Sequence, residues 1–261
     1  MTRTKRASRK SLVRSISLVV FALANHVSAY GQNDGVSQSA WYVYTGDHPV
    51  SKLWAIHVEA QARRSPVLAN AQQILIRTGV DRTISSQWTS LAGYTYVNDT
   101  PPAGSTRISG TELRHTLFGQ IELEERVHKL SYSQTLRLEN TFASSRAEDE
   151  SVTWSFRQRF RYHLETQIPA FYQRHAMLPD YYAVFDEIAL SIRPSASREV
   201  LNQNRVYAAL GWKLGDFERV ELGYMYQFLP VSNGIVAENN NSLQITLHSV
   251  RPLKSLLRRD R

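Results

Sequence analysis

Hydrophobic and polar residues alternate along most of the chain from about residue 50 onward. In the clearest stretch, 130–142, Leu136 and Leu138 fall on one face, and Arg137 and Glu139 fall on the other. Successive side chains of a β-strand point to opposite faces, so this period of two predicts a strand with one apolar and one polar face. The pattern recurs often enough to predict a chain built almost wholly from β-strands.

Ten runs of this kind can be recognised. They are 53–63, 72–82, 86–97, 111–125, 130–142, 152–165, 181–193, 203–214, 219–228 and 242–250. Several exceed the 5 to 6 residues, roughly, of an ordinary strand and match the roughly 9 to 11 residues with which a tilted strand crosses a bilayer. Residues 40–47 form a further run. Alone it spoils the parity of an antiparallel barrel, so either a twelfth strand is hidden or this run packs outside the regular count.

The predicted connections alternate between short and long. Short links are expected at 82–85, 125–129 and 215–218, and long polar links at 64–70, 98–110, 143–150, 194–201 and 230–240; the link 166–180 is long where a short one is expected. Short turns on one side and long loops on the other are typical of outer-membrane barrels, with the short turns in the periplasm. Ten strands that begin upward at residue 53 would leave both ends of the barrel on the short-turn side.

The composition of the two faces favours a membrane barrel over a soluble one. The polar face carries long charged side chains in successive strands, whereas the other face is Trp, Tyr, Phe, Leu and Val. A sheet in lipid must close, because the bilayer offers no partner to an open edge. The predicted fold is therefore an all-β, transmembrane, antiparallel up-and-down β-barrel of 10 to 12 strands. A soluble exported β-protein is the alternative.

Charge changes this picture only at the N-terminus. The chain has 31 Lys and Arg against 23 Asp and Glu, a net charge of +8, but residues 1–29 hold six of the basic residues and no acid. The nearly neutral remainder lacks the concentrated basic face of a nucleic-acid-binding protein. A basic stretch, an apolar run at 16–24 and the small residues of 27–29 predict a cleaved signal peptide at 1–29 rather than an anchored amphipathic segment. We expect a single barrel domain at 30–251 and a basic tail at 252–261.

Charged residues of the polar face are expected to form a charge network in the lumen. Its predicted members are Glu59, Arg63, Arg77, Glu122, Glu124, Arg137, Glu139, Arg157, Arg159, Arg161, Glu187, Arg205, Arg219 and Glu221. In a narrow lumen such acids and bases neutralise one another, which would give the network a structural role. The alternative is a narrow channel for anions or other small solutes, since three arginines stack along 157–161 and basic constrictions select anions.

Catalytic patterns are weak. The sequence lacks GxSxG, HExxH, a Gly-rich phosphate loop and any His/Asp/Glu cluster with metal-ligand spacing, and the absence of Cys removes thiolate chemistry. A lipid- or lipopolysaccharide-modifying enzyme would use the outward His115, although Thr116 and Ser90 give it no convincing partner pattern. His57, His163 and His248 are expected to point inward as members of the network. No catalytic residue, metal or cofactor is predicted.

Short motifs in a fixed order resemble a known family. They are RTGVDRTISSQWTSLAGYTYV at 77–97, Glu112 with LEERV at 123–127, LRLEN at 136–140, RQRFRY at 157–162, DE at 186–187, NR at 204–205 and ELGY at 221–224. Together they are similar to the bacterial family named domain of unknown function 2490, over roughly residues 50–250. The resemblance implies an outer-membrane barrel without an assigned activity. The predicted barrel, rather than the resemblance, implies as partners outer-membrane lipids, the barrel-assembly machinery and a small solute of unknown identity, and the charge distribution implies no nucleic acid. The chain departs from the usual outer-membrane ending, because its basic tail has no terminal Phe.

Overall fold

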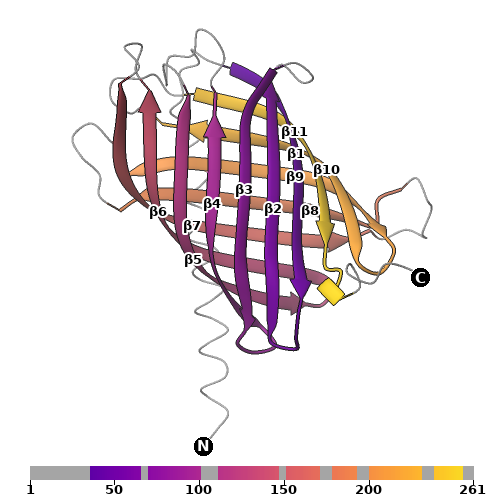
Figure 1. The fold of residues 1–261 in the computed structure, drawn as a ribbon. Coiled ribbons are helices and arrows are strands. Elements are labelled where there is room, and N and C mark those ends of the chain that lie inside the picture. Colours follow the sequence, from indigo (N-terminus) through magenta and orange to yellow (C-terminus); the bar gives the residue numbers. More distant parts are fainter. Residues whose placement is uncertain are drawn as a thin grey trace, which may run out of the picture.

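The computed structural model describes residues 36–65, 70–100, 111–146, 151–170, 178–192, 200–230 and 238–254. Within these residues, eleven strands form one closed barrel (Figure 1). The strands are β1 (Val36–Pro49), β2 (Trp54–Ser65), β3 (Asn70–Thr83), β4 (Trp88–Asp99), β5 (Glu112–Val127), β6 (Leu130–Arg146), β7 (Val152–Pro169), β8 (Tyr181–Ser191), β9 (Leu201–Leu214), β10 (Glu218–Leu229) and β11 (Glu238–Ser249). The predicted signal peptide lies outside the described residues, as does the tail from residue 255.

The predicted all-β closed barrel is confirmed, with a strand number inside the expected range, and its position across a membrane stays a prediction. Each of the ten predicted runs overlaps one strand, and each strand pairs with its neighbour in sequence in the antiparallel sense. The helical residues within the described ranges include no helix long and apolar enough to cross a membrane.

The strand at 40–47 enters the barrel in a way that the sequence did not predict. It forms most of β1, which pairs with β11 in parallel, from Val36 opposite Asn239 to Gly46 opposite Ser249. Neither a hidden twelfth strand nor a position outside the barrel is needed, because one parallel pair lets an odd number of strands close. The sheet is therefore antiparallel everywhere except at this seam. Figure 1 shows β1 and β11 side by side, running in the same direction.

The parallel seam also separates the two ends of the barrel. β1 and β11 both run from the rim that carries the long connections to the rim that carries the short turns, so Val36 and Ser249 lie at opposite rims. The expectation that both ends share one side is wrong for this reason. At the short-turn rim, two residues have the left-handed backbone that tight turns require: His128 with φ 56° and Gly215 with φ 89°.

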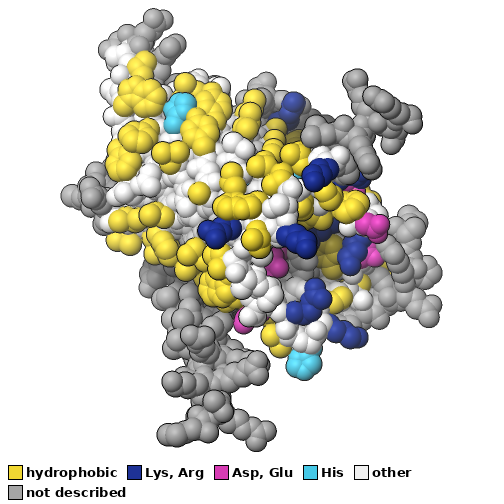
Figure 2. Space-filling model, turned by 60° about the horizontal axis from the view of Figure 1, so that its bottom comes forward, with side chains coloured by type: hydrophobic (Ala, Val, Ile, Leu, Met, Phe, Trp, Pro, Cys, Tyr) yellow, Lys and Arg dark blue, Asp and Glu magenta, His cyan; other side chains and the backbone are white. Residues whose placement is uncertain are grey.

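Hydrophobic side chains cover the outer wall of the barrel. Large exposed ones occur on every strand from β2 to β11, including Ile76, Leu117, Leu138, Val206 and Leu243. Figure 2 shows hydrophobic side chains gathered over much of the visible wall, with basic side chains nearer one end. The residues that alternate with them point into the lumen. On one side of the lumen these are apolar, and they form a buried cluster of Trp41, Tyr181, Ala183, Tyr207, Ala209 and Met225.

Candidate functional site

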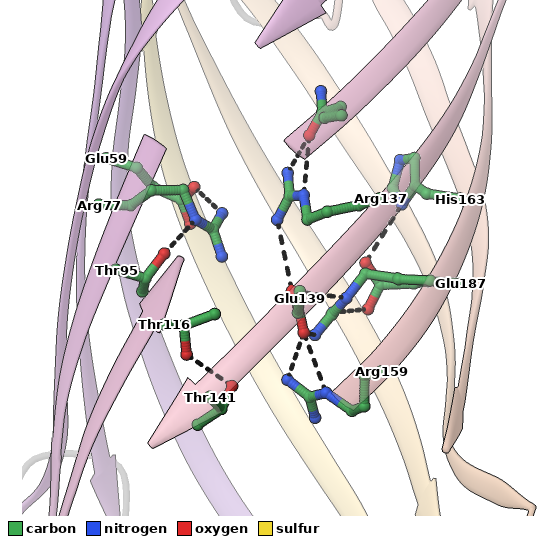
Figure 3. A network of polar contacts seen from close by, with 12 residues as sticks. Glu59, Arg77, Thr95, Thr116, Arg137, Glu139, Thr141, Arg159, His163 and Glu187 are labelled. Carbon is green, nitrogen blue, oxygen red and sulfur yellow. Dashed lines mark hydrogen bonds and ion pairs between the residues drawn. The ribbon is translucent and has the colours of Figure 1, made fainter. Parts of the chain in front are cut away.

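The remainder of the lumen is charged, and Glu139 lies at the centre of its charges. This β6 carboxylate accepts hydrogen bonds from Nε and Nη2 of Arg159, at 2.9 and 2.7 Å. It also forms ion pairs with Arg161 at 3.3 Å and with Arg137 at 3.9 Å. Three guanidinium groups therefore surround one buried carboxylate, as Figure 3 shows for Arg137 and Arg159.

A second carboxylate, Glu187 on β8, extends these contacts. It pairs with Arg161 and, at 3.4 Å, with Nη1 of Arg205 on β9. Its other oxygen lies 3.7 Å from Nδ1 of His163, whose Nε2 lies 3.7 Å from Glu165. His163 is thus placed in the interior, where the alternation of β7 puts it.

The third carboxylate, Glu59 on β2, pairs with Arg77 on β3. Arg77 also donates a hydrogen bond from Nε to Thr95 at 3.0 Å. Arg77 and Arg137 both lie over the ring of Phe118, at 5.4 and 5.0 Å from its centre. This ring therefore connects the Glu59–Arg77 pair with the contacts of Glu139. We call Glu59, Arg77, Arg137, Glu139, Arg159, Arg161, Glu187 and Arg205 the arginine cluster.

Positive charge exceeds negative charge in the arginine cluster. It contains five guanidinium groups and three carboxylates, all on described residues. Access to the cluster changes along β7: the exposed fraction of the side chain falls from 39% at Arg157 to 30% at Arg159 and 9% at Arg161. Along β7, the arginines therefore become more deeply buried with distance from the rim with long connections, as far as Arg161.

The other predicted members of the network lie outside the arginine cluster. Glu122 accepts a hydrogen bond from Ser133 at 2.5 Å, and Glu124 is exposed near the β5–β6 turn. Arg157 pairs with Glu112 at 2.9 Å. The remaining three flank the apolar side of the lumen. Arg63 stacks on Trp41, Arg219 lies opposite His248 in the register, and Glu221 accepts a hydrogen bond from Tyr181 at 2.8 Å and approaches His248 at 3.4 Å.

His115 lies on the outer wall, among aromatic rings. Its Nδ1 is 2.6 Å from the hydroxyl of Tyr94, and its ring centre is 5.6 Å from that of Tyr96 and 6.0 Å from that of Trp154. Ser90 is six residues from Tyr96 along β4, and Thr116 points into the lumen, where it bonds Thr141. These surroundings are typical of an interfacial aromatic girdle. Neither Ser90 nor Thr116 is placed to act as a partner of His115.

The structure also joins three residues that spacing along the chain did not bring together. Asp47, His57 and Asp81 come from β1, β2 and β3, and one ligand atom of each lies within 4.8 Å of the others. The alternation places each of them on the inward face. Their proximity depends on how β1, β2 and β3 are aligned with one another. The spacing of ligand residues along the chain does not contain that information.

Comparisons with known proteins identify a family and a similar fold. The family described as "Protein of unknown function (DUF2490)" matches residues 38–239. No protein with a curated description matches the chain. Among solved structures, a NanC porin is similar with a TM-score of 0.46 and 12% sequence identity, over 82% of this chain and 98% of the porin chain.

Proposed function

We propose that this chain, which belongs to the DUF2490 family of proteins of unknown function, is a bacterial outer-membrane barrel that passes small anions through its lumen. The proposal has two parts, the position in the membrane and the selectivity of the lumen. The first rests on the outer wall and the second on the arginine cluster.

The outer wall supports a membrane position. Its large exposed side chains in mid-strand are hydrophobic, including Ile76, Leu117, Leu138 and Ile245, while charged side chains occupy the inward positions of the same strands. A soluble barrel has the reverse arrangement, with its apolar face inside. A closed sheet leaves no unpaired edge for lipid to solvate. Cell fractionation tests this position. The membrane position is wrong if the folded protein is released with the periplasmic fraction in the absence of detergent.

The selectivity for anions rests on the excess of guanidinium groups over carboxylates in the arginine cluster. Arg157 and Arg159 are accessible from the rim with long connections, and below them Arg161 and Arg137 share the carboxylate of Glu139. An anion that enters from this rim meets cations that the local carboxylates do not fully neutralise. Rings of Arg or Lys favour anions in this way in other pores.

Conductance across a planar lipid bilayer tests the selectivity. With a KCl gradient, the wild-type chain is expected to give current steps and a reversal potential of the sign set by chloride. Arg159→Glu is expected to reduce or reverse this selectivity, since it removes an accessible cation beside Glu139. The matched control is Arg82→Glu, an exposed outer-wall arginine that lies over Trp54; its selectivity should be unchanged. Absence of current steps, or cation selectivity in the wild type, would overturn the channel.

A further inference from the structure

We propose that Asp47, His57 and Asp81 bind a divalent transition-metal ion of the Zn²⁺ class at the short-turn mouth of the lumen. The site does not depend on the arginine cluster passing anions. It follows from the geometry of the three ligands, the surroundings of His57 and the local balance of charge.

The three side chains converge from neighbouring strands. Asp47 lies near the end of β1 and opposite His57 in the β1–β2 register, and Asp81 follows Gly79, the partner of His57 on β3, by two residues. Their ligand atoms lie within 4.8 Å of one another, and Nδ1 of His57 is 2.7 Å from Oδ1 of Asp47. Ligands at about 2.0 to 2.2 Å from a tetrahedral Zn²⁺ are roughly 3.4 Å apart. Small side-chain rotations would bring the three ligand atoms to that separation.

The second nitrogen of His57 faces the kind of partner that supports a metal-bound histidine. His57 is only 8% exposed, and its Nε2 is buried without a hydrogen-bond partner. This Nε2 lies 3.7 Å from the carboxylate of Glu59, which Arg77 and Gln61 hold in place. A histidine that binds a metal usually donates its other N–H to a carboxylate, which fixes the orientation of the ring. With the metal on Nδ1, Glu59 is positioned to take that role.

The local charge favours a cation. Within the described part of the chain, neither Asp47 nor Asp81 forms an ion pair with Lys or Arg, and the charge partner of Asp47 is His57. The nearby His48 is engaged elsewhere, with the hydroxyl of Tyr44 and the carbonyl of Arg251. Two adjacent carboxylates repel each other, and a divalent ion between them removes that repulsion. The side chain of Asp47 is half exposed, so an ion can enter from the mouth.

The ligand set selects the class of metal. Ca²⁺ and Mg²⁺ prefer sites made wholly of oxygen ligands, whereas an imidazole nitrogen together with carboxylates suits Zn²⁺ and its neighbours in the first transition row. Three protein ligands leave a fourth tetrahedral position for water or for an anionic solute. Glu59 contacts both His57 and Arg77, so one carboxylate connects this site to the arginine cluster.

Zinc titration of the folded, tag-free full chain in detergent tests the proposal. We expect one Zn²⁺ per chain, and tetrahedral Co²⁺ absorption when Co²⁺ replaces it. His57→Gln and Asp81→Asn should each weaken binding at least tenfold, and Glu59→Gln, which keeps all three ligands, should weaken it about tenfold. Asp99→Asn is the matched control. Asp99 is a half-buried aspartate at the opposite rim, where Arg114 contacts it at 3.0 Å, so its substitution should leave zinc affinity unchanged.

Two results would overturn the site. One is absence of stoichiometric binding to the folded wild type. The other is binding that persists in both His57→Gln and Asp81→Asn, which would place the ion elsewhere. Heat-modifiable gel mobility of each variant shows whether the barrel has folded, so loss of binding through misfolding is recognised. Because His57→Gln removes no negative charge, a weakened affinity in that variant separates a site with a histidine ligand from a merely acidic mouth.

Discussion

At the scale of single residues, the alternation identified which charges point inward but not which of them pair. The sequence indicates that Glu139 and Arg161 share the polar face. Their contact at 3.3 Å depends on the register of β6 against β7, which places Glu139 opposite Arg159 and Arg137 opposite Arg161. Registers are set by turns and by packing across the barrel, and a single strand does not contain that information. The group of Asp47, His57 and Asp81 escaped sequence reasoning for the same reason.

Removal of the central carboxylate should destabilise the barrel strongly. Glu139→Gln leaves three guanidinium groups, those of Arg137 and Arg161 largely buried, with one counter-charge fewer, and breaking a buried ion pair from one side costs about 3 to 5 kcal/mol. We expect a loss of about 3 kcal/mol in the free energy of unfolding, measured by denaturant titration in lipid vesicles. The exposed Glu124→Gln is the control and should change it by less than about 0.5 kcal/mol. Equal effects would contradict a central role for Glu139.

Two glycines of the wall should respond in opposite ways to an added methyl group. In Gly211→Ala the new Cβ would collide with the ring of Tyr181, which lies directly over the glycine, whereas a Cβ on Gly119 meets no atom within 4 Å. We expect Gly211→Ala to lower the free energy of unfolding by about 1 to 3 kcal/mol. Gly119→Ala should leave it unchanged or raise it by up to about 1 kcal/mol. Thermal or denaturant unfolding of the two variants measures these changes. An unchanged free energy of unfolding in Gly211→Ala would contradict the position of the Tyr181 ring over the glycine.

At the scale of elements, the strands were largely predictable and their closure was not. Runs such as 130–142 and 152–165 lie within β6 and β7, because a period of two is a local property. The β1–β11 seam joins residues that are 203 positions apart. Bacterial single-chain outer-membrane barrels have an even number of antiparallel strands, and the parallel seam departs from that rule. A strand count based on the rule therefore could not place 40–47 correctly.

An engineered disulfide tests the seam directly. Ser39 and Ser242 face each other in the register, with their hydroxyl oxygens 2.7 Å apart, and the chain has no cysteine of its own. Ser39→Cys with Ser242→Cys should therefore oxidise to an intramolecular disulfide, seen as a shift in gel mobility that reductant reverses. Ser39→Cys with Gln244→Cys, two residues further along β11, is the control and should cross-link far less. The opposite ranking would show a different register.

At the scale of the whole molecule, a wall that faces lipid predicts that the cost of an added charge depends on its position along the strand. Leu138 lies in the middle of β6 and is 44% exposed, whereas Leu214 lies at the end of β9 near a short turn and is 53% exposed. In a bilayer, Leu138→Arg should cost about 2 to 4 kcal/mol of unfolding free energy and Leu214→Arg about 0 to 1. Unfolding from lipid vesicles measures both. Equally small costs would mean that the wall faces water.

The parallel seam has a further consequence, for the order in which the barrel assembles. Every antiparallel pair joins strands that are neighbours in sequence, but β1 and β11 meet only after the whole chain between them has been brought into place. Long-range contacts are slow to form, because the entropy of closing the loop is lost before the contact is gained. Hydrogen bonding can therefore proceed from strand to strand, with closure as the last and rate-limiting step. Until then β1 and β11 are both open edges, the two places where an unfinished barrel could pair with another chain.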